Sequence, residues 1–178
     1  MTWKSFHNRG EILRSVIAAA DTRRDGVLPM DVDGVAETFG DELTLLAALQ
    51  LKWHTRLAGH IEKALADQPL DLDAAVGSAW AETAARMPGI RLVLDHYRAH
   101  PVDDALARAM RKAAAKEHMM LAVMAGRSSV GDAAAVSVGA QLEEAARLHH
   151  HRIPTVGASP GAHARATLLD RLKAVMAA

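Results

Sequence analysis

The sequence of 178 residues contains no cysteine. The absence of thiols excludes disulfides, thiolate zinc sites, iron–sulfur ligation and cysteine nucleophiles, and it is typical of a reducing compartment. The opening residues, MTWKSFHNRG, lack the apolar run of a signal peptide, and no uninterrupted apolar stretch approaches the ~20 residues of a membrane span. These absences predict a cytoplasmic protein that does not span a membrane.

Aromatic residues and net charge are also scarce. Only 3% of the residues are aromatic although 50% are hydrophobic, so alanine, leucine, valine and methionine must fill the interior. The 21 basic and 21 acidic residues cancel, and no stretch concentrates the lysines and arginines that phosphate binding requires. The composition therefore argues against a nucleic-acid partner.

Helical periodicity runs through the chain, and strand patterns are nearly absent. A chain of this length most often forms one domain with its own hydrophobic core. We therefore expect residues 1–178 to form an all-α, single-domain bundle of about six to seven helices. The expected helices cover residues 3–22, 41–67, 72–87, 88–98, 103–125, 131–151 and 162–176, with a short helical turn inside 30–39 and a loop over about 152–161 before a docked C-terminal helix.

The longest pattern covers residues 41–67 and predicts the central helix. Asp41 is a suitable N-cap, and Glu42 follows it at the positive end of the helix dipole. Gln50 and His54 are polar residues within the apolar face and His60 lies at its edge, which makes these three residues candidates for chemistry. The apolar face itself consists of Leu43, Leu46, Leu49, Trp53, Leu57, Ile61, Ala64 and Leu65.

Two tryptophans mark the predicted core. Trp53 lies on the apolar side of the central helix, and Trp80 lies on the apolar side of the helix expected at 72–87. We therefore expect both rings at buried helix contacts. The helices at 41–67, 103–125 and 131–151 should form the main part of this core.

Glu117 falls in the middle of the apolar stripe of the helix expected at 103–125. A carboxylate in an apolar interior is costly unless it is protonated, paired or bound to a metal. We expect a partner from another helix, with Gln50, His54 or His149 within hydrogen-bond reach of Glu117 or one bridging atom away. The alternative is an ion pair between Glu117 and an arginine at the edge of its helix.

Inward carboxylates and imidazoles on facing helices can also hold metal ions. Glu117, His54 and His149 are therefore the candidate ligands of a transition metal. The Glu-x-x-His signature of ferritin-like carboxylate sites is absent from the sequence. His100 precedes Pro101 at a helix end, which weakens the helical spacing of His96 and His100 as a ligand pair. The three consecutive histidines from His149 point in different directions, so a solvated or capping role is the alternative for this run.

Two further stretches imitate functional motifs. Residues 21–32 imitate a calcium loop, but Arg23 stands at its third position and Val32 stands where a bidentate glutamate should be. Residues 157–161, GASPG, match G-x-S-x-G, but Pro160 follows the serine and has no N–H for an oxyanion hole. Both stretches are therefore predicted to be loops.

Three functions are compatible with the sequence. The leading hypothesis is a non-catalytic helical protein that associates with itself or with a protein partner, because no complete catalytic signature is present. The second is a metal-binding bundle or metal-dependent enzyme built around Glu117, His54 and His149. The third is a binder of a small apolar ligand in a pocket lined by Met110, Met119, Met120 and Met124.

Overall fold

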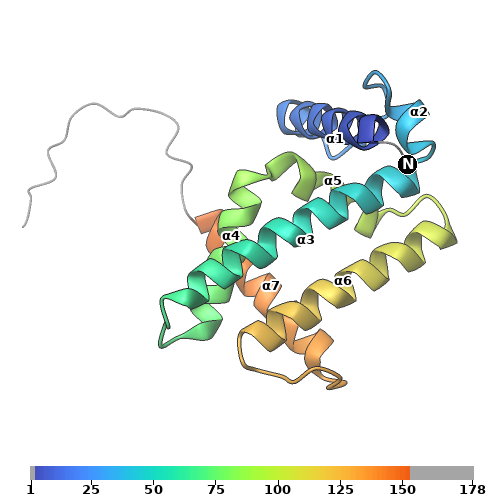
Figure 1. Ribbon diagram of the computed structural model, residues 1–178. Coiled ribbons are helices and arrows are strands. Elements are labelled where there is room, and N and C mark those ends of the chain that lie inside the picture. Colours follow the sequence, from blue (N-terminus) through green and yellow to red (C-terminus); the bar gives the residue numbers. More distant parts are fainter. Residues whose placement is uncertain (1–2, 153–178) are drawn as a thin grey trace, which may run out of the picture.

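The described part of the chain folds into seven helices, and no strand occurs within it (Figure 1). The structure is a computed structural model that describes the backbone of residues 3–152 and the side chains of residues 8–148. The prediction of an all-α, single-domain bundle around a long central helix is confirmed. Three other predictions lie outside the described residues: the loop after Arg152, the GASPG stretch within it and the helix at 162–176. The helices are α1 (Trp3–Arg23), α2 (Val35–Phe39), α3 (Glu42–Ala66), α4 (Leu72–Arg86), α5 (Pro88–Ala99), α6 (Asp104–Met124) and α7 (Ala135–Arg152).

Three aspartates start helices at the expected places. Asp41, Asp71 and Asp103 precede α3, α4 and α6, and each side chain accepts the backbone N–H three residues later, at 2.7, 2.9 and 2.7 Å. Each bond satisfies a backbone donor that the first turn of a helix leaves without a partner. Pro88 occupies the first turn of α5, where its missing N–H is not needed.

The central helix α3 crosses the molecule, and the other helices are arranged around it (Figure 1). α4 packs along α3, α1 packs on α5, and α6 pairs closely with α7, which in turn packs on α4. α3 and α6 run in the same direction but contact each other only sparsely. The α6–α7 pair is therefore attached to α3 mainly through α4.

The core contains the tryptophan contact that the apolar faces predict. Trp53 on α3 and Trp80 on α4 are both buried, and their ring centroids lie 5.8 Å apart at an interplanar angle of 73°. This edge-to-face geometry is one that aromatic pairs favour. The predicted burial of both rings is confirmed, and the pair joins the central helix to α4.

Glycine lets two pairs of helices approach backbone to backbone. A Cβ on Gly139 of α7 would lie 1.8 Å from the carbonyl oxygen of His118 in α6. A Cβ on Gly89 of α5 would lie 2.3 Å from the carbonyl carbon of Ala20 in α1. Because no side chain fits at such distances, both helix contacts depend on glycine.

Two local predictions are wrong. α7 begins at Ala135 instead of Gly131, because Gly131 takes a φ of 92° and the side chain of Asp132 accepts the N–H of Ala134 at 2.8 Å. These contacts form a turn before the helix. Leu43, expected in the core, is 40% exposed because it lies where α3 faces α6 across a gap in the packing.

The stretch that imitates a calcium loop uses its charged groups for internal contacts. Asp21 accepts the backbone N–H of Gly89 at 2.7 Å. Arg23 forms an ion pair with Asp31. The first contact joins the end of α1 to the start of α5, and the second joins the end of α1 to the chain that follows it.

Candidate functional site

Glu117 is the most deeply buried acidic residue in the described part of the chain, with an exposed fraction of 0%. It lies on the inner face of α6, as the apolar stripe predicts. Trp80 Nε1 donates a hydrogen bond of 3.1 Å to its Oε1. A guanidinium nitrogen of Arg91 lies 3.5 Å from Glu117 Oε1, and one of Arg98 lies 3.8 Å from Glu117 Oε2. An indole N–H and two cations therefore compensate the buried charge.

The expected contact of Glu117 with the central helix is not observed. Neither Gln50 nor His54 is hydrogen-bonded to Glu117, and the side chain of His149 lies outside the described residues. Arginines are the observed charged partners, but they come from α5 and Arg91 is buried, whereas the alternative placed the arginine at the edge of the helix. The only sequence signal for this arginine was an acid four residues later, at Asp95, which is a common ion-pair spacing on helices.

Arg91 and Arg98 belong to a larger group of charged side chains between α5, α6 and α7. At its centre is Glu143, which is 4% exposed and accepts hydrogen bonds from Arg98 NH1 at 3.0 and 3.2 Å and from Arg147 Nε at 3.0 Å. His118 Nε2 lies 2.6 Å from the second oxygen of Glu143. We call this group the arginine–carboxylate cluster; it consists of Arg91, Asp95, Arg98, Glu117, His118, Glu143 and Arg147.

The arginine–carboxylate cluster is also packed against the tryptophan pair. Asp95 accepts hydrogen bonds from Arg91 at 2.8 Å and from Arg147 at 2.7 and 2.8 Å. The guanidinium of Arg91 lies 4.7 Å from the ring centroid of Trp53, and that of Arg147 lies 4.9 Å from the ring centroid of Trp80. Each such cation–π contact contributes ~0.5–2 kcal/mol. These two arginines are therefore held by carboxylates and by aromatic rings together.

Burial and ion pairing act in opposite directions on the acids of the cluster. Burial raises the pKa of Glu143, but the hydrogen bond from His118 and the charges of Arg98 and Arg147 outweigh burial, so this pKa lies well below its ordinary value. The same balance lowers the pKa of Asp95, where burial is opposed chiefly by the hydrogen bond from Arg147. These carboxyls are therefore charged at neutral pH.

The lowered pKa values predict that acid weakens the fold. A carboxyl with a lower pKa in the folded state stabilises the protein fully above its unfolded pKa, and that contribution is lost as the pH falls toward the folded pKa. The ordinary values for Glu143 and Asp95 are 4.5 and 3.8, so the free energy of unfolding should fall steadily as the pH decreases below these values. Urea unfolding at about pH 6, 4 and 3 measures this loss. A free energy of unfolding that stays level or rises over this range would contradict the prediction.

In this geometry the cluster fixes helices to one another. Its charged groups are directed at each other, and none of its members lines the groove described below. Both oxygens of Glu143 and of Asp95 accept hydrogen bonds from other members of the cluster, whereas Glu117 Oε2 is ion-paired with Arg98 but accepts no hydrogen bond among the described residues. We therefore assign the cluster a structural role and place the candidate site elsewhere.

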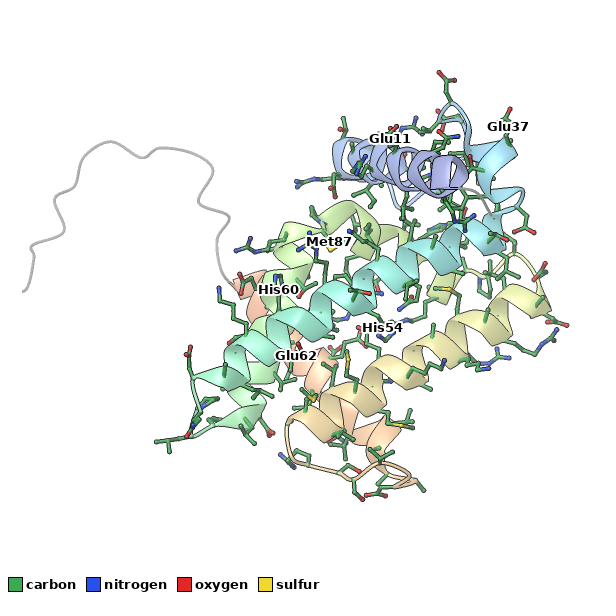
Figure 2. All side chains as sticks on the ribbon, viewed as in Figure 1. Glu11, Glu37, His54, His60, Glu62 and Met87 are labelled. Carbon is green, nitrogen blue, oxygen red and sulfur yellow. The ribbon has the colours of Figure 1, made fainter. Side chains whose placement is uncertain are left out.

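A groove of about 520 Å³ lies between α3 and α6. His54 projects from α3 toward α6 (Figure 2) and lines this groove, as does Gln50 one turn earlier. Of the four methionines in the predicted pocket, Met110 and Met120 line the groove, whereas Met119 and Met124 do not. The apolar part of the wall includes Leu43, Leu46, Leu106, Ala109, Met110 and Met120.

Gln50 is the polar group inside this apolar wall. Its exposed fraction is 9%, and its amide nitrogen is buried without a hydrogen-bond partner among the described residues. A buried donor left unpaired costs ~1–3 kcal/mol. The groove therefore contains a donor that has no acceptor within the folded chain as far as it is described.

Lys112 and Lys116 form the edge of the groove on the α6 side. Both are exposed, and no ion pair joins either of them to an acid within residues 8–148. A spacing of four places both side chains on one face of the helix. The groove is therefore apolar inside and basic along this edge.

The three predicted metal ligands lie in different places. Glu117 is part of the arginine–carboxylate cluster, His54 lines the groove, and the side chain of His149 is outside the described residues. Among the side chains that the structure places, no three histidines or acids form a group that could hold a metal ion. A transition-metal site formed by these residues stays a prediction.

Comparison of the chain with protein-family models, with curated proteins and with solved structures gave no match. None of the helices between residues 3 and 152 has the length and apolar character needed to cross a bilayer. The groove and its polar groups are therefore the features of the molecule on which a function can be proposed.

Proposed function

We propose that this protein binds a small, mainly apolar ligand in the groove between α3 and α6. The observation that carries the proposal is the amide of Gln50, a buried donor without a partner among the described residues, in a wall whose other polar side chains are His54 and the two lysines at the edge. The groove volume of about 520 Å³ falls within the ~300–1,000 Å³ of small-molecule sites. Such sites combine apolar walls with a few polar groups that orient the ligand.

An unpaired amide at position 50 lowers the stability of the ligand-free protein. Leucine has a similar size and would suit an apolar wall without that penalty. A ligand atom that accepts a hydrogen bond from Gln50 removes the penalty and fixes the orientation of the ligand. The position and chemistry of Gln50 therefore favour a role in binding over a role in packing.

The groove also has a bearing on the hypothesis of association. A helix of a second protein can lie between two helices, and Leu51 on the α3 edge is 68% exposed. Gln50, in contrast, lies within the recess and is nearly inaccessible from outside. A small molecule in the recess can contact the side chain of Gln50, whose buried amide nitrogen must turn toward the ligand to donate a hydrogen bond, so the proposal commits to a small molecule.

The variant Gln50→Leu tests the proposal through two opposite effects. It should raise the free energy of unfolding by about 1 kcal/mol, because the unpaired donor is removed. It should also weaken the binding of an amphipathic fluorescent probe, the aromatic anion 8-anilinonaphthalene-1-sulfonate, by about fivefold or more, because one hydrogen bond to the probe is lost. Urea unfolding and a fluorescence titration of the full chain measure the two effects.

Gln141→Leu is the matched control, since Gln141 is exposed on α7. Its free energy of unfolding should change by no more than about 0.5 kcal/mol, and its affinity for the probe should not change. If Gln50→Leu destabilises the protein or leaves the affinity for the probe unchanged, the proposal is wrong. A protein that sediments as a dimer and that Leu51→Asp converts to a monomer would instead support association through this edge.

A further inference from the structure

We infer that the ligand is an amphiphile, with an aliphatic chain in the apolar end of the groove and a carboxylate head at its basic end. This inference rests on the proposed function and specifies the class of ligand. Three observations support it. They are the order of residues along the two walls of the groove, the lack of ion pairs at Lys112 and Lys116 among the described residues, and the amide nitrogen of Gln50, which has no described acceptor.

The two walls of the groove change character in the same direction. α3 and α6 run in parallel (Figure 1), so residues early in α3 share one end of the groove with residues early in α6. The early part of each wall is entirely apolar, and the polar groups occur only in the later part, where apolar side chains alternate with them. In chain order the α3 wall includes Leu43, Leu46, Ala47, Gln50, Leu51 and His54, and the α6 wall includes Leu106, Ala109, Met110, Lys112, Ala113, Lys116 and Met120.

Among the described side chains, none supplies a counter-charge at the basic end of the groove. Lys112 and Lys116 are four residues apart on α6, a spacing at which like charges repel. No residue that lines the groove is acidic, and neither lysine has an ion pair among the described side chains. An anion placed between the two ammonium groups relieves their repulsion and is attracted by both.

The unpaired donor favours the same chemistry. The amide nitrogen of Gln50 needs an acceptor, and hydrogen bonds to a charged oxygen are stronger than those to a neutral one. A carboxylate offers two such oxygens, so it can meet Gln50 and the lysines together. A neutral alcohol would satisfy Gln50 alone, and an alkyl ammonium ion would satisfy neither.

Three twelve-carbon probes test the inference on the full chain by calorimetric titration: dodecanoate and dodecylammonium below their micelle concentrations, and dodecanol below its solubility limit. Dodecanoate should bind about tenfold more tightly than dodecanol, and dodecylammonium should bind more weakly than both. The double variant Lys112→Gln and Lys116→Gln should bind dodecanoate about tenfold more weakly and dodecanol as well as the wild type does.

The double variant Arg108→Gln and Arg111→Gln is the matched control. It removes the same charge from exposed positions of α6 that do not line the groove, so its affinity for dodecanoate should equal that of the wild type. If dodecanoate and dodecanol bind with equal affinity, or if both double variants lose the same affinity for dodecanoate, the ligand does not carry a carboxylate head. The proposed apolar site would not be contradicted by either result. If none of the three probes binds and Gln50→Leu has no effect on the fluorescent probe, the proposed function itself fails.

Discussion

Replacing Trp80 by alanine is expected to lower the free energy of unfolding by about 4 kcal/mol, near the upper part of the range for large core truncations. The ring is buried against Trp53, and its N–H is the hydrogen-bond donor to Glu117. Its removal therefore leaves a cavity and a buried carboxylate that has lost its hydrogen bond. The guanidinium of Arg147 also loses the ring over which it lies.

Thermal and urea unfolding of Trp80→Ala and Trp80→Phe separate these contributions. The phenylalanine variant keeps most of the buried area but removes the N–H, so it should lose less stability, about 1–3 kcal/mol. If Trp80→Ala unfolds at the same urea concentration as the wild type, α4 does not pack on α3 in the way described. If both variants lose the same amount, the hydrogen bond to Glu117 accounts for nearly all of the effect.

The variant Glu143→Gln is expected to lose about 3–5 kcal/mol, because it leaves buried charges without their partner. Arg98, Arg147 and His118 all contact this carboxylate. The glutamine amide has one oxygen that accepts hydrogen bonds, and its NH₂ group would lie against the donors of the arginines. Urea unfolding at neutral pH measures the loss.

Glu144→Gln provides the control for this variant, because Glu144 is the exposed neighbour on α7. Its stability should stay within about 0.5 kcal/mol of the wild type. Below the ordinary pKa of the carboxyl, the gap between the two variants should narrow, because Glu143 in the control variant then takes up a proton on unfolding. Two variants with equal stability at neutral pH would show that Glu143 is not the centre of a buried cluster.

Features that depend on neighbouring residues could be predicted from the sequence. Asp41, Asp71 and Asp103 cap helices through contacts three residues away, so their pattern is visible without a fold. The burial of Glu117 follows from helical periodicity in the same way. The start of α7 was missed because the turn around Gly131 competes with a helical pattern that begins at the same place.

Features that depend on how helices pack could not be predicted in this way. The partner of Glu117 comes from α5, and periodicity does not indicate which helix faces which. The apolar face of α3 is also broader than the surface that its neighbours cover, and a sequence pattern cannot tell a packed leucine from one that lines a groove. Gln50 was recognised as an unusual polar residue, but its lack of a partner appears only in the packed structure.

The backbone contact at Gly139 gives α6 a fixed position relative to α7. His118, which makes this contact, points away from the groove, since it is two residues from Lys116 and therefore about 200° around the helix. A larger residue at position 139 cannot fit against the backbone of α6, so it would force α6 and α7 apart. Because α6 also forms one wall of the groove, the width of the groove depends on a glycine on the opposite side of that helix.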